Sequence, residues 1–489
     1  MPINTNKESR IRSRSVLSHL RRDLGTLESY AALIGILIGA GIFKVTSQAW
    51  SYTGPSVILG YIILVPAILA TSIPYAAFLS TPLGREPGGE YLHISRTLGG
   101  FRIAYLGAWL KIISYIGAGA YLADALAGYL LEFTRGFLTP ERFHLPVALA
   151  ALIFFFVINA IGVRWFGRMQ VLMCALKGVA LLVLIVPGLF AIHRTNYIPF
   201  ITHGFNGLAA SLLPLFFAYA GFESLAQTAG EVKDSTRRLP MVLLIGISAT
   251  ALIYLLMSIV AFGVLPGGRL QSSPAPMAEV ASVYLPAGAA AFVTFGAVMA
   301  IMTALNGTML VPSRLAILFV EDGLAPEWIG FINPRTATPV RGLLLTLLAC
   351  IALLVTGQFV LALTIAVFAL IVLYFLHSLV FLLLPRMRPA LYRQIDLAMP
   401  RWLLTTSAVV SLIAMGSMLL VQTLQDIQTL RTQTLRHRIA NHTLTSIELI
   451  FAWGLIGVAL YGLMRWSAPR VPQESAASEE YTPEIELRH

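Results

Sequence analysis

Lysines inside apolar segments are the first feature of this sequence that could do chemistry. The chain has five lysines, and Lys44, Lys111 and Lys177 lie within long apolar stretches, whereas its arginines gather at the ends of such stretches. A charge inside a membrane is costly and is by default functional, and a buried lysine, unlike an arginine, can release its proton. The sequence therefore contains groups that could couple a membrane process to protons.

Three other ionisable residues each allow two interpretations. Glu223 adjoins an interrupted apolar segment, where it could act by protonation or form a structural hydrogen bond. His377 could relay protons, or it could be a hydrogen-bonded packing residue of its apolar segment. Glu90 lies close to Arg96 in the sequence, which fits either a solvated loop or a gating salt bridge.

Composition indicates a membrane protein. The chain is 57% hydrophobic and 12% charged, with a mean hydropathy of +0.78, against roughly 25% charged residues in a soluble domain. The net charge of +11 forms no aromatic-interleaved patch of the kind that binds nucleic acid. Cys174 and Cys350 lie far apart in apolar segments, which favours packing over a metal site or a disulfide. We expect no metal, no nucleic acid partner and no cofactor, with a proton as the coupling ion.

Hydropathy predicts twelve transmembrane helices. The predicted spans are 27–50, 55–80, 103–131, 146–163, 169–192, 207–229, 241–264, 286–312, 341–357, 359–384, 402–424 and 446–466. With the N-terminus in the cytoplasm, the inner segments hold 24 Lys and Arg residues and the outer loops hold 7. The positive-inside rule then predicts cytoplasmic N- and C-termini in a multi-pass protein of the plasma membrane. The sequence leaves the oligomeric state open.

Two predicted spans are interrupted near their middle. The first contains Ile38-Gly39-Ala40-Gly41-Ile42-Phe43, and the sixth contains Phe217-Ala218-Tyr219-Ala220-Gly221-Phe222-Glu223 after Pro214. Taken alone, either stretch could merely allow close helix packing. Each, however, falls in the first helix of one half of a five-plus-five arrangement, whose halves cross the membrane in opposite senses. Paired interrupted helices of such inverted repeats mark a binding site.

Unwound backbone inside a membrane also predicts the ligand. Its unpaired N–H and C=O groups are tolerable only around a cavity. Donors at the start of the half-helix after Gly41 suit a carboxylate, and carbonyls that end the half-helix before Ala218 suit an ammonium. An α-amino acid presents both groups. We expect a neutral one, because no acidic pocket for a cationic side chain is evident.

At these residues the chain resembles the amino acid-polyamine-organocation superfamily of permeases. The resemblance rests on IGAGIF, on FFAYAGFESLAQTAGEVKDSTRRLP, on Pro87 to Tyr91, on Trp109 and on the run GTMLVPSRLAILFVEDGLAPEWIGFINPRTATPVRG. It implies an all-α integral membrane protein in which a five-plus-five inverted repeat, with discontinuous helices 1 and 6, is joined by two peripheral helices. The parts would be a cytoplasmic tail at 1–25, the transport core at 26–385, peripheral spans at 386–466 and a cytoplasmic tail at 467–489.

The resemblance also implies roles for residues. The substrate-binding residues would be Gly39, Ala40, Gly41, Ile42, Phe217, Ala218, Tyr219, Gly221 and Thr308. Phe217 is similar to an aromatic gate over the ligand, and Glu223 to the acid that transmits substrate occupancy. Lys177 occupies the position where an ammonium replaces a sodium ion, so that it would either couple transport to protons or act as a structural tether. Members that exchange arginine for its decarboxylated product have a tryptophan near Thr308, so that exchange is disfavoured.

These features together predict a secondary active transporter that works by alternating access, with proton-coupled symport of a neutral amino acid. An exchanger of amino acids or polyamines is the alternative, and a non-transporting amino acid sensor is a further one. The sequence contains no G-x-x-x-x-G-K-[ST], H-E-x-x-H or G-x-S-x-G motif, which disfavours an ATP-driven pump or a membrane enzyme.

Overall fold

The computed structural model describes residues 20–39, 41–133, 140–273, 275–357, 359–440 and 444–467. These residues form helices and turns, with two isolated β-bridges and no strand. Helices are expected because backbone in lipid must find its hydrogen bonds within its own segment. The main helices are α2 (Thr26–Leu37), α3 (Thr46–Thr53), α4 (Val57–Leu79), α5 (Glu90–Leu98), α6 (Phe101–Phe133), α7 (Pro140–Ile161), α8 (Val163–Gly188), α9 (Gly204–Tyr219), α10 (Ser224–Gln227), α11 (Ser235–Val264), α12 (Gly267–Ser272), α13 (Pro276–Tyr284), α14 (Ala287–Glu321), α15 (Val340–Val355), α16 (Phe359–Met387), α17 (Pro389–Arg393), α18 (Arg401–Thr432), α19 (Leu435–Ala440) and α20 (Ser446–Ser467).

Eleven helical segments in the described part of the chain are long and apolar enough to cross a membrane. They coincide with eleven of the predicted spans. The remaining prediction, at 341–357, corresponds to α15, an apolar helix of 16 residues. This helix ends at Val355, and Gly357 follows it with φ +69°, a left-handed conformation that commonly terminates a helix. The all-helical membrane fold is therefore confirmed, with the ninth span shorter than a typical membrane-crossing helix.

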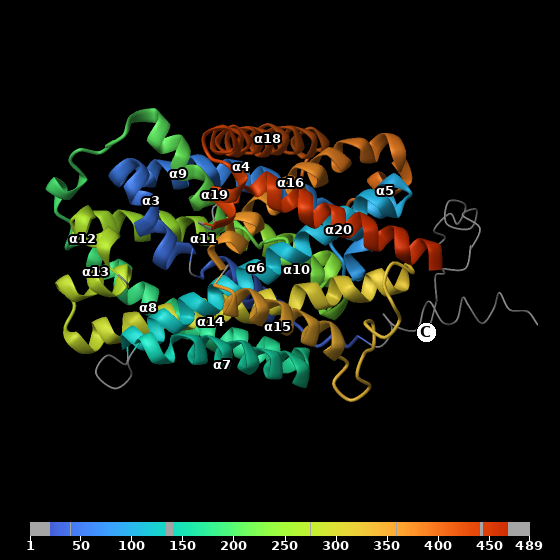
Figure 1. The fold of residues 1–489 in the computed structure, drawn as a ribbon, viewed down its shortest axis with the longest axis horizontal. Coiled ribbons are helices and arrows are strands. Elements are labelled where there is room, and N and C mark those ends of the chain that lie inside the picture. The colour runs from blue at the N-terminus through green and yellow to red at the C-terminus, as the bar shows by residue number, and fades with distance from the viewer. Residues whose placement is uncertain are drawn as a thin grey trace, which may run out of the picture.

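The helices pack around α6, α14 and α2. In the described chain, α6 runs along α14 and α16, α14 runs along α8, and α2 contacts α8, α11 and α14. In Figure 1, α18 forms one edge of the bundle, and α7 and α15 form the opposite edge. The same view places α5 and the C-terminal part of α20 at one end of the molecule, and α12 and α13 at the other.

The last two spans pack on the outside of this core. Helix α18 contacts α4 and α16, and α20 contacts α6 and α16. The indole rings of Trp109 and Trp453 stack with centroids 4.5 Å apart, and each indole N–H donates to the backbone carbonyl of the other residue at 2.9 Å. This reciprocal pair fixes α20 to α6.

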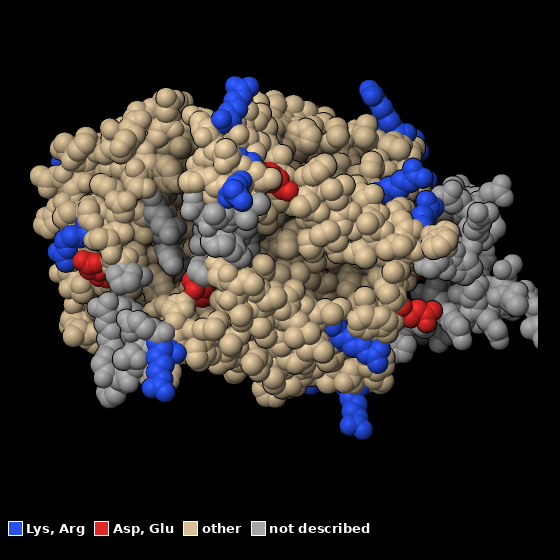
Figure 2. All heavy atoms as spheres, viewed as in Figure 1, with Lys and Arg blue, Asp and Glu red and all other residues tan. Residues whose placement is uncertain are grey.

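The outer surface is suited to lipid. Large apolar side chains such as Leu182 and Phe451 are 62% and 67% exposed. Figure 2 shows a face on which charged side chains are few and uncharged surface predominates. Exposed apolar patches of this extent are unusual on a soluble monomer. The chain is a multi-pass integral membrane protein.

Candidate functional site

Both predicted helix interruptions are present, and they touch each other. Helix α2 ends at Leu37, and the helical run resumes with a π-helical turn at Gly41–Val45 that leads into α3. Helix α9 ends at Tyr219, and α10 begins at Ser224. A Cβ atom placed on Gly41 would lie 2.6 Å from the Cα atom of Ala218, so that the two breaks approach each other more closely than any larger residue would allow.

A tyrosine from a third helix holds the two breaks together. The Tyr254 hydroxyl, on α11, lies 2.7 Å from the carbonyl oxygen of Ala218 and is also hydrogen-bonded to the carbonyl oxygen of Leu37. Its ring is fully buried. The carbonyl of Ala218 therefore already accepts one hydrogen bond, and the expectation that carbonyls before Ala218 bind a substrate ammonium stays a prediction. The sequence did not indicate this role for Tyr254, because no motif around it distinguishes it from the other tyrosines of the chain.

Removing this hydroxyl should loosen the site. We expect Tyr254→Phe to cost about 1–3 kcal/mol, because the two buried carbonyls lose the one hydroxyl hydrogen that they share. We expect this cost to fall on the ligand-competent state, so that substrate affinity drops by about 5-fold to 150-fold. Substrate-dependent thermal stabilisation of the purified protein measures the drop. Tyr197→Phe is the matched control, since the Tyr197 hydroxyl donates to the Ile259 carbonyl away from both breaks. Equal affinity in the two variants would contradict this role of Tyr254.

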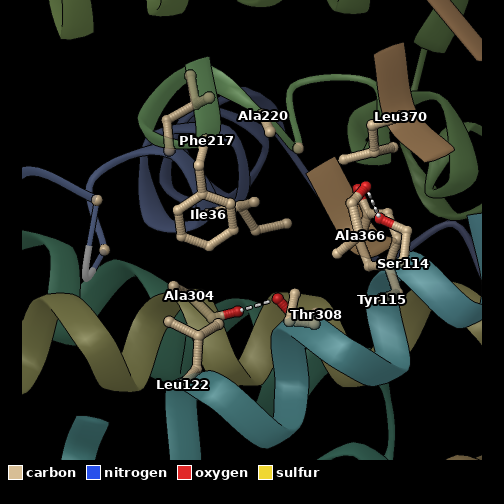
Figure 3. Close-up of a pocket in the computed structure, with 15 residues that line it drawn as sticks. Ile36, Ser114, Tyr115, Leu122, Phe217, Ala220, Ala304, Thr308, Ala366 and Leu370 are labelled. Carbon is tan, nitrogen blue, oxygen red and sulfur yellow. Dashed lines mark hydrogen bonds between the residues drawn. The ribbon is translucent and has the colours of Figure 1, made fainter. Parts of the chain in front are cut away.

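A cavity lies beside the breaks (Figure 3). Its volume, taken as the space that the centre of a water-sized sphere can occupy, is about 40 Å³. In Figure 3, Phe217 from α9 lies on one side, with Ala304 and Thr308 from α14 opposite and Ser114 and Tyr115 from α6 beside them. The lining residues are Ile36, Leu37, Gly39, Gly41, Ser114, Tyr115, Ala118, Leu122, Phe217, Ala220, Gly221, Ala304, Thr308, Ala366 and Leu370.

The predicted substrate residues divide between the cavity and its surroundings. Five of them line the cavity, namely Gly39, Gly41, Phe217, Gly221 and Thr308. Ile42, Ala218 and Tyr219 are buried next to the breaks but do not line it. The ring of Tyr219 packs instead against Tyr61 and Tyr254. Ala40 lies outside the described residues, as does the side chain of Lys44. The binding roles themselves stay predictions.

The cavity wall is mostly apolar. The hydroxyl of Thr308 donates to the carbonyl of Ala304 at 2.7 Å, and the hydroxyl of Ser114 donates to the carbonyl of Ala366 at 3.0 Å, as the dashed lines in Figure 3 show. Both hydroxyl hydrogens are therefore used within the protein, and the oxygens can only accept. No acidic or basic side chain is among the described residues that line the cavity. Such a wall suits an apolar ligand side chain.

Glu223 lies directly behind this wall. The Tyr115 hydroxyl, whose residue lines the cavity, donates to Glu223 Oε1 at 2.6 Å, and the Tyr374 hydroxyl donates to Oε2. Glu223 is 1% exposed. The structure thus places the predicted coupling acid one hydrogen bond away from the cavity. Whether it transmits substrate occupancy stays a prediction.

Sequence reasoning missed the partners of Lys111. Its Nζ atom lies 2.8 Å and 3.0 Å from the two carboxylate oxygens of Glu90, and 3.8 Å from Glu223 Oε1. Glu90 therefore forms its ion pair with Lys111, and a pairing with Arg96 is not seen in the described chain. Lys111 does not reach the aqueous face, since it is 1% exposed. The available signal was Lys111 itself, a charge within a predicted span, whereas Glu90 lies outside the predicted spans.

Lys177 lies between the first and eighth spans. Its Nζ atom donates to the carbonyls of Ile34 and Ile38 at 3.0 Å and 2.9 Å, and it lies 3.0 Å from the Thr303 hydroxyl on α14. The carbonyl of Gly35 lies at 3.4 Å. In the described part of the chain no carboxylate forms a salt bridge with it. Neutral oxygens around one buried charge resemble the ligand set of a small cation.

His377 has a partner that the sequence did not reveal. Its Nε2 atom lies 2.9 Å from His93 Nδ1, and both rings are buried. The His377 ring stacks on Tyr75 with centroids 3.7 Å apart, and the His93 ring stacks on Phe78. No hydrogen bond joins this pair to Lys177 or to the cavity lining in the described residues. The structure therefore favours a packing role over a relay along that route.

Comparisons with known proteins agree with this geometry. The chain matches the sequence model of a family described as amino acid permease over residues 24–434. It is 26% identical over 340 residues to the branched-chain amino acid permease of Bacillus subtilis (strain 168), covering 65% of this chain and 71% of that protein. It is 26% identical over 343 residues to the methylthioribose transporter of the same organism, covering 67% and 73%. It is 27% identical over 348 residues to the vacuolar cationic amino acid transporter 4 of Arabidopsis thaliana, covering 66% and 56%.

Proposed function

Because the chain belongs to the amino acid permease family, we propose that it moves a neutral α-amino acid across the membrane together with a proton. The observation that supports this most strongly is the position of Lys177. Its ammonium holds the carbonyls of Ile34 and Ile38, just before the break in the first span, against Thr303 of α14. A lysine that loses its proton keeps only two N–H donors and no charge for these three oxygen partners, so the bridge weakens and proton binding is linked to the shape of the site.

The cavity supports a neutral substrate. A cationic side chain would need a carboxylate, but the described lining has none, and both oxygens of Glu223 behind it already accept tyrosine hydroxyls. The relatives include both a branched-chain amino acid permease and cationic amino acid transporters, so their names do not decide between the classes. Apolar residues such as Leu122 and Leu370 favour an aliphatic side chain.

We place the substrate backbone at the two breaks. The helical run that starts at Gly41 begins beside the cavity, and the first N–H groups of a helix lack partners within it, so they suit the carboxylate. The ammonium then faces the turn between α9 and α10, near Gly221. This pose leaves the substrate side chain directed towards the apolar wall.

Competition experiments test the substrate class. Burial of a leucine side chain in an apolar site contributes about 1.5–3 kcal/mol relative to exposure. In proteoliposomes that contain the purified protein, leucine, isoleucine or valine should therefore inhibit uptake of a labelled neutral amino acid at least about tenfold better than glycine. Lysine and arginine should compete poorly. Strong competition by cationic amino acids or by amines without a carboxylate would contradict the proposal.

The same proposal includes an orientation. We place both termini in the cytoplasm, because that arrangement puts 24 basic residues on the inner side and 7 on the outer side. Labelling of single cysteines introduced near each terminus with a membrane-impermeant reagent in intact cells tests it. Labelling of either terminus without permeabilisation would reverse the orientation.

A further inference from the structure

A second buried ionisable cluster, which we call the acidic triad, consists of Glu90, Lys111 and Glu223. All three side chains are at most 2% exposed. Lys111 is closest to Glu90, at 2.8 Å, and lies 3.8 Å from Glu223. Glu90 begins α5, Lys111 lies on α6, and Glu223 lies in the turn between α9 and α10. The triad therefore joins three separate elements behind the cavity wall.

The charges of the acidic triad do not balance. Two carboxylates and one ammonium leave one negative charge uncompensated, and no other Lys or Arg among the described residues forms a salt bridge with Glu90 or Glu223. Burying an unpaired charge is strongly unfavourable, and two carboxyl groups around one site commonly share a proton. We propose that Glu90 and Glu223 together bind one proton, with Lys111 as their shared counter-ion. The cluster is then neutral as a whole.

The groups around the triad supply hydrogens but no fixed charge. They are Tyr75 from α4, His93 from α5, Tyr115 from α6, Gln227 from α10, and Tyr374 and His377 from α16. Tyr75 and Gln227 donate to Glu90 at 2.9 Å and 3.2 Å. The two imidazoles are hydrogen-bonded to each other and make no described hydrogen bond to either carboxyl. The surroundings therefore leave the charge deficit of the triad in place.

The two carboxyls differ in the number of hydrogen-bond donors that contact them. Glu90 receives four donor contacts, two of them from the Lys111 ammonium, whereas Glu223 receives only two tyrosine hydroxyls and a more distant ammonium. The shared proton is bound by the pair, and Tyr115 connects it to the cavity wall. Taking up this proton converts one carboxylate into a carboxylic acid, whose O–H then donates to a neighbouring oxygen. The site is distinct from Lys177, which contacts α2 and α14.

Infrared difference spectroscopy of the purified, ligand-free protein tests this directly, since a protonated carboxyl has its own C=O stretch. The native protein should show this band near neutral pH. Removing either carboxylate balances the charges, so Glu90→Gln and Glu223→Gln should each lose it. Removing the ammonium has the opposite effect, because Lys111→Met leaves two uncompensated carboxylates, so its band should grow and persist to higher pH. Lys111→Arg keeps the charge and should resemble the native protein.

The controls separate this site from other acids and from misfolding. Asp322→Asn removes a partly buried acid that pairs with Tyr91 outside the triad, and should leave the triad band in place. If Lys111→Met does not fold, the two glutamine variants and Lys111→Arg still test whether the two carboxyls share a proton. A native protein without the band, or a band that survives in both glutamine variants, would overturn the proposal. This inference depends on the proposed function only where it assigns the shared proton a role in transport. Because the readout requires no transport, its failure is distinguishable from a failure of the proposed function.

Discussion

Replacement of Lys177 by alanine is expected to abolish proton-driven accumulation of substrate. The Lys177 ammonium is the only described group that ties the carbonyls of Ile34 and Ile38 to Thr303. Without it the site can no longer distinguish a protonated from a deprotonated state, so an inward proton gradient should no longer raise the internal substrate concentration above equilibrium. Uptake into proteoliposomes at equal and unequal pH measures the loss.

Two further variants keep this test informative. Lys177→Arg retains the charge but cannot release a proton at accessible pH, so it should still exchange substrate while losing its response to the proton gradient. Gly178→Ala is the matched control, because an added Cβ there meets no atom within 4 Å. It should accumulate substrate like the native protein. Accumulation by Lys177→Ala under a pH gradient would show that another group couples transport to protons.

Branched substitutions at the helix breaks are expected to abolish substrate binding. A Cβ on Gly39 would lie 2.6 Å from the Cβ of Ala304, and a Cβ on Gly221 would lie 2.6 Å from Ile36, at a φ of +103° that other residues rarely adopt. Gly39→Val and Gly221→Val should therefore displace the cavity walls. Substrate binding should fall by more than about 100-fold, or 2.7 kcal/mol, in a scintillation proximity assay on purified protein.

The same substitution elsewhere shows whether the effect is specific. Gly462 on α20 has open space around it, with no atom within 4 Å of an added Cβ. Gly462→Val should insert into the membrane and bind substrate normally. If Gly39→Val or Gly221→Val also binds substrate with native affinity, the cavity beside the breaks is not the substrate site.

The sequence predicted the parts of this site that depend on hydropathy and backbone. The broken first and sixth spans were recognisable because glycines interrupt otherwise continuous apolar runs. Lys177 could be placed because the family resemblance implies an ammonium at this position of the fifth span. Eleven spans followed from apolar length alone, and α15 was the exception because Gly357 ends it early.

Contacts between helices were not predictable in the same way. Lys111 and Glu90 are 21 residues apart, and Tyr254 reaches two breaks that lie 217 and 36 residues away. Such pairs depend on how each helix is rotated about its axis, which hydropathy does not determine in a segment that is apolar all round. Ala218 and Tyr219 do not line the cavity, for a related reason. Helix α9 continues to Tyr219, so only part of the predicted run can share a face with Phe217.

Sodium-free uptake is the most direct test of the central claim. Proteoliposomes containing the native protein would be given a labelled branched-chain amino acid in sodium-free buffer, with and without an inward proton gradient. The geometry of Lys177 and the apolar cavity predict accumulation above equilibrium only when the gradient is present, and collapse of that accumulation when a protonophore is added. Uptake that requires sodium, or that is indifferent to the proton gradient, would contradict the account.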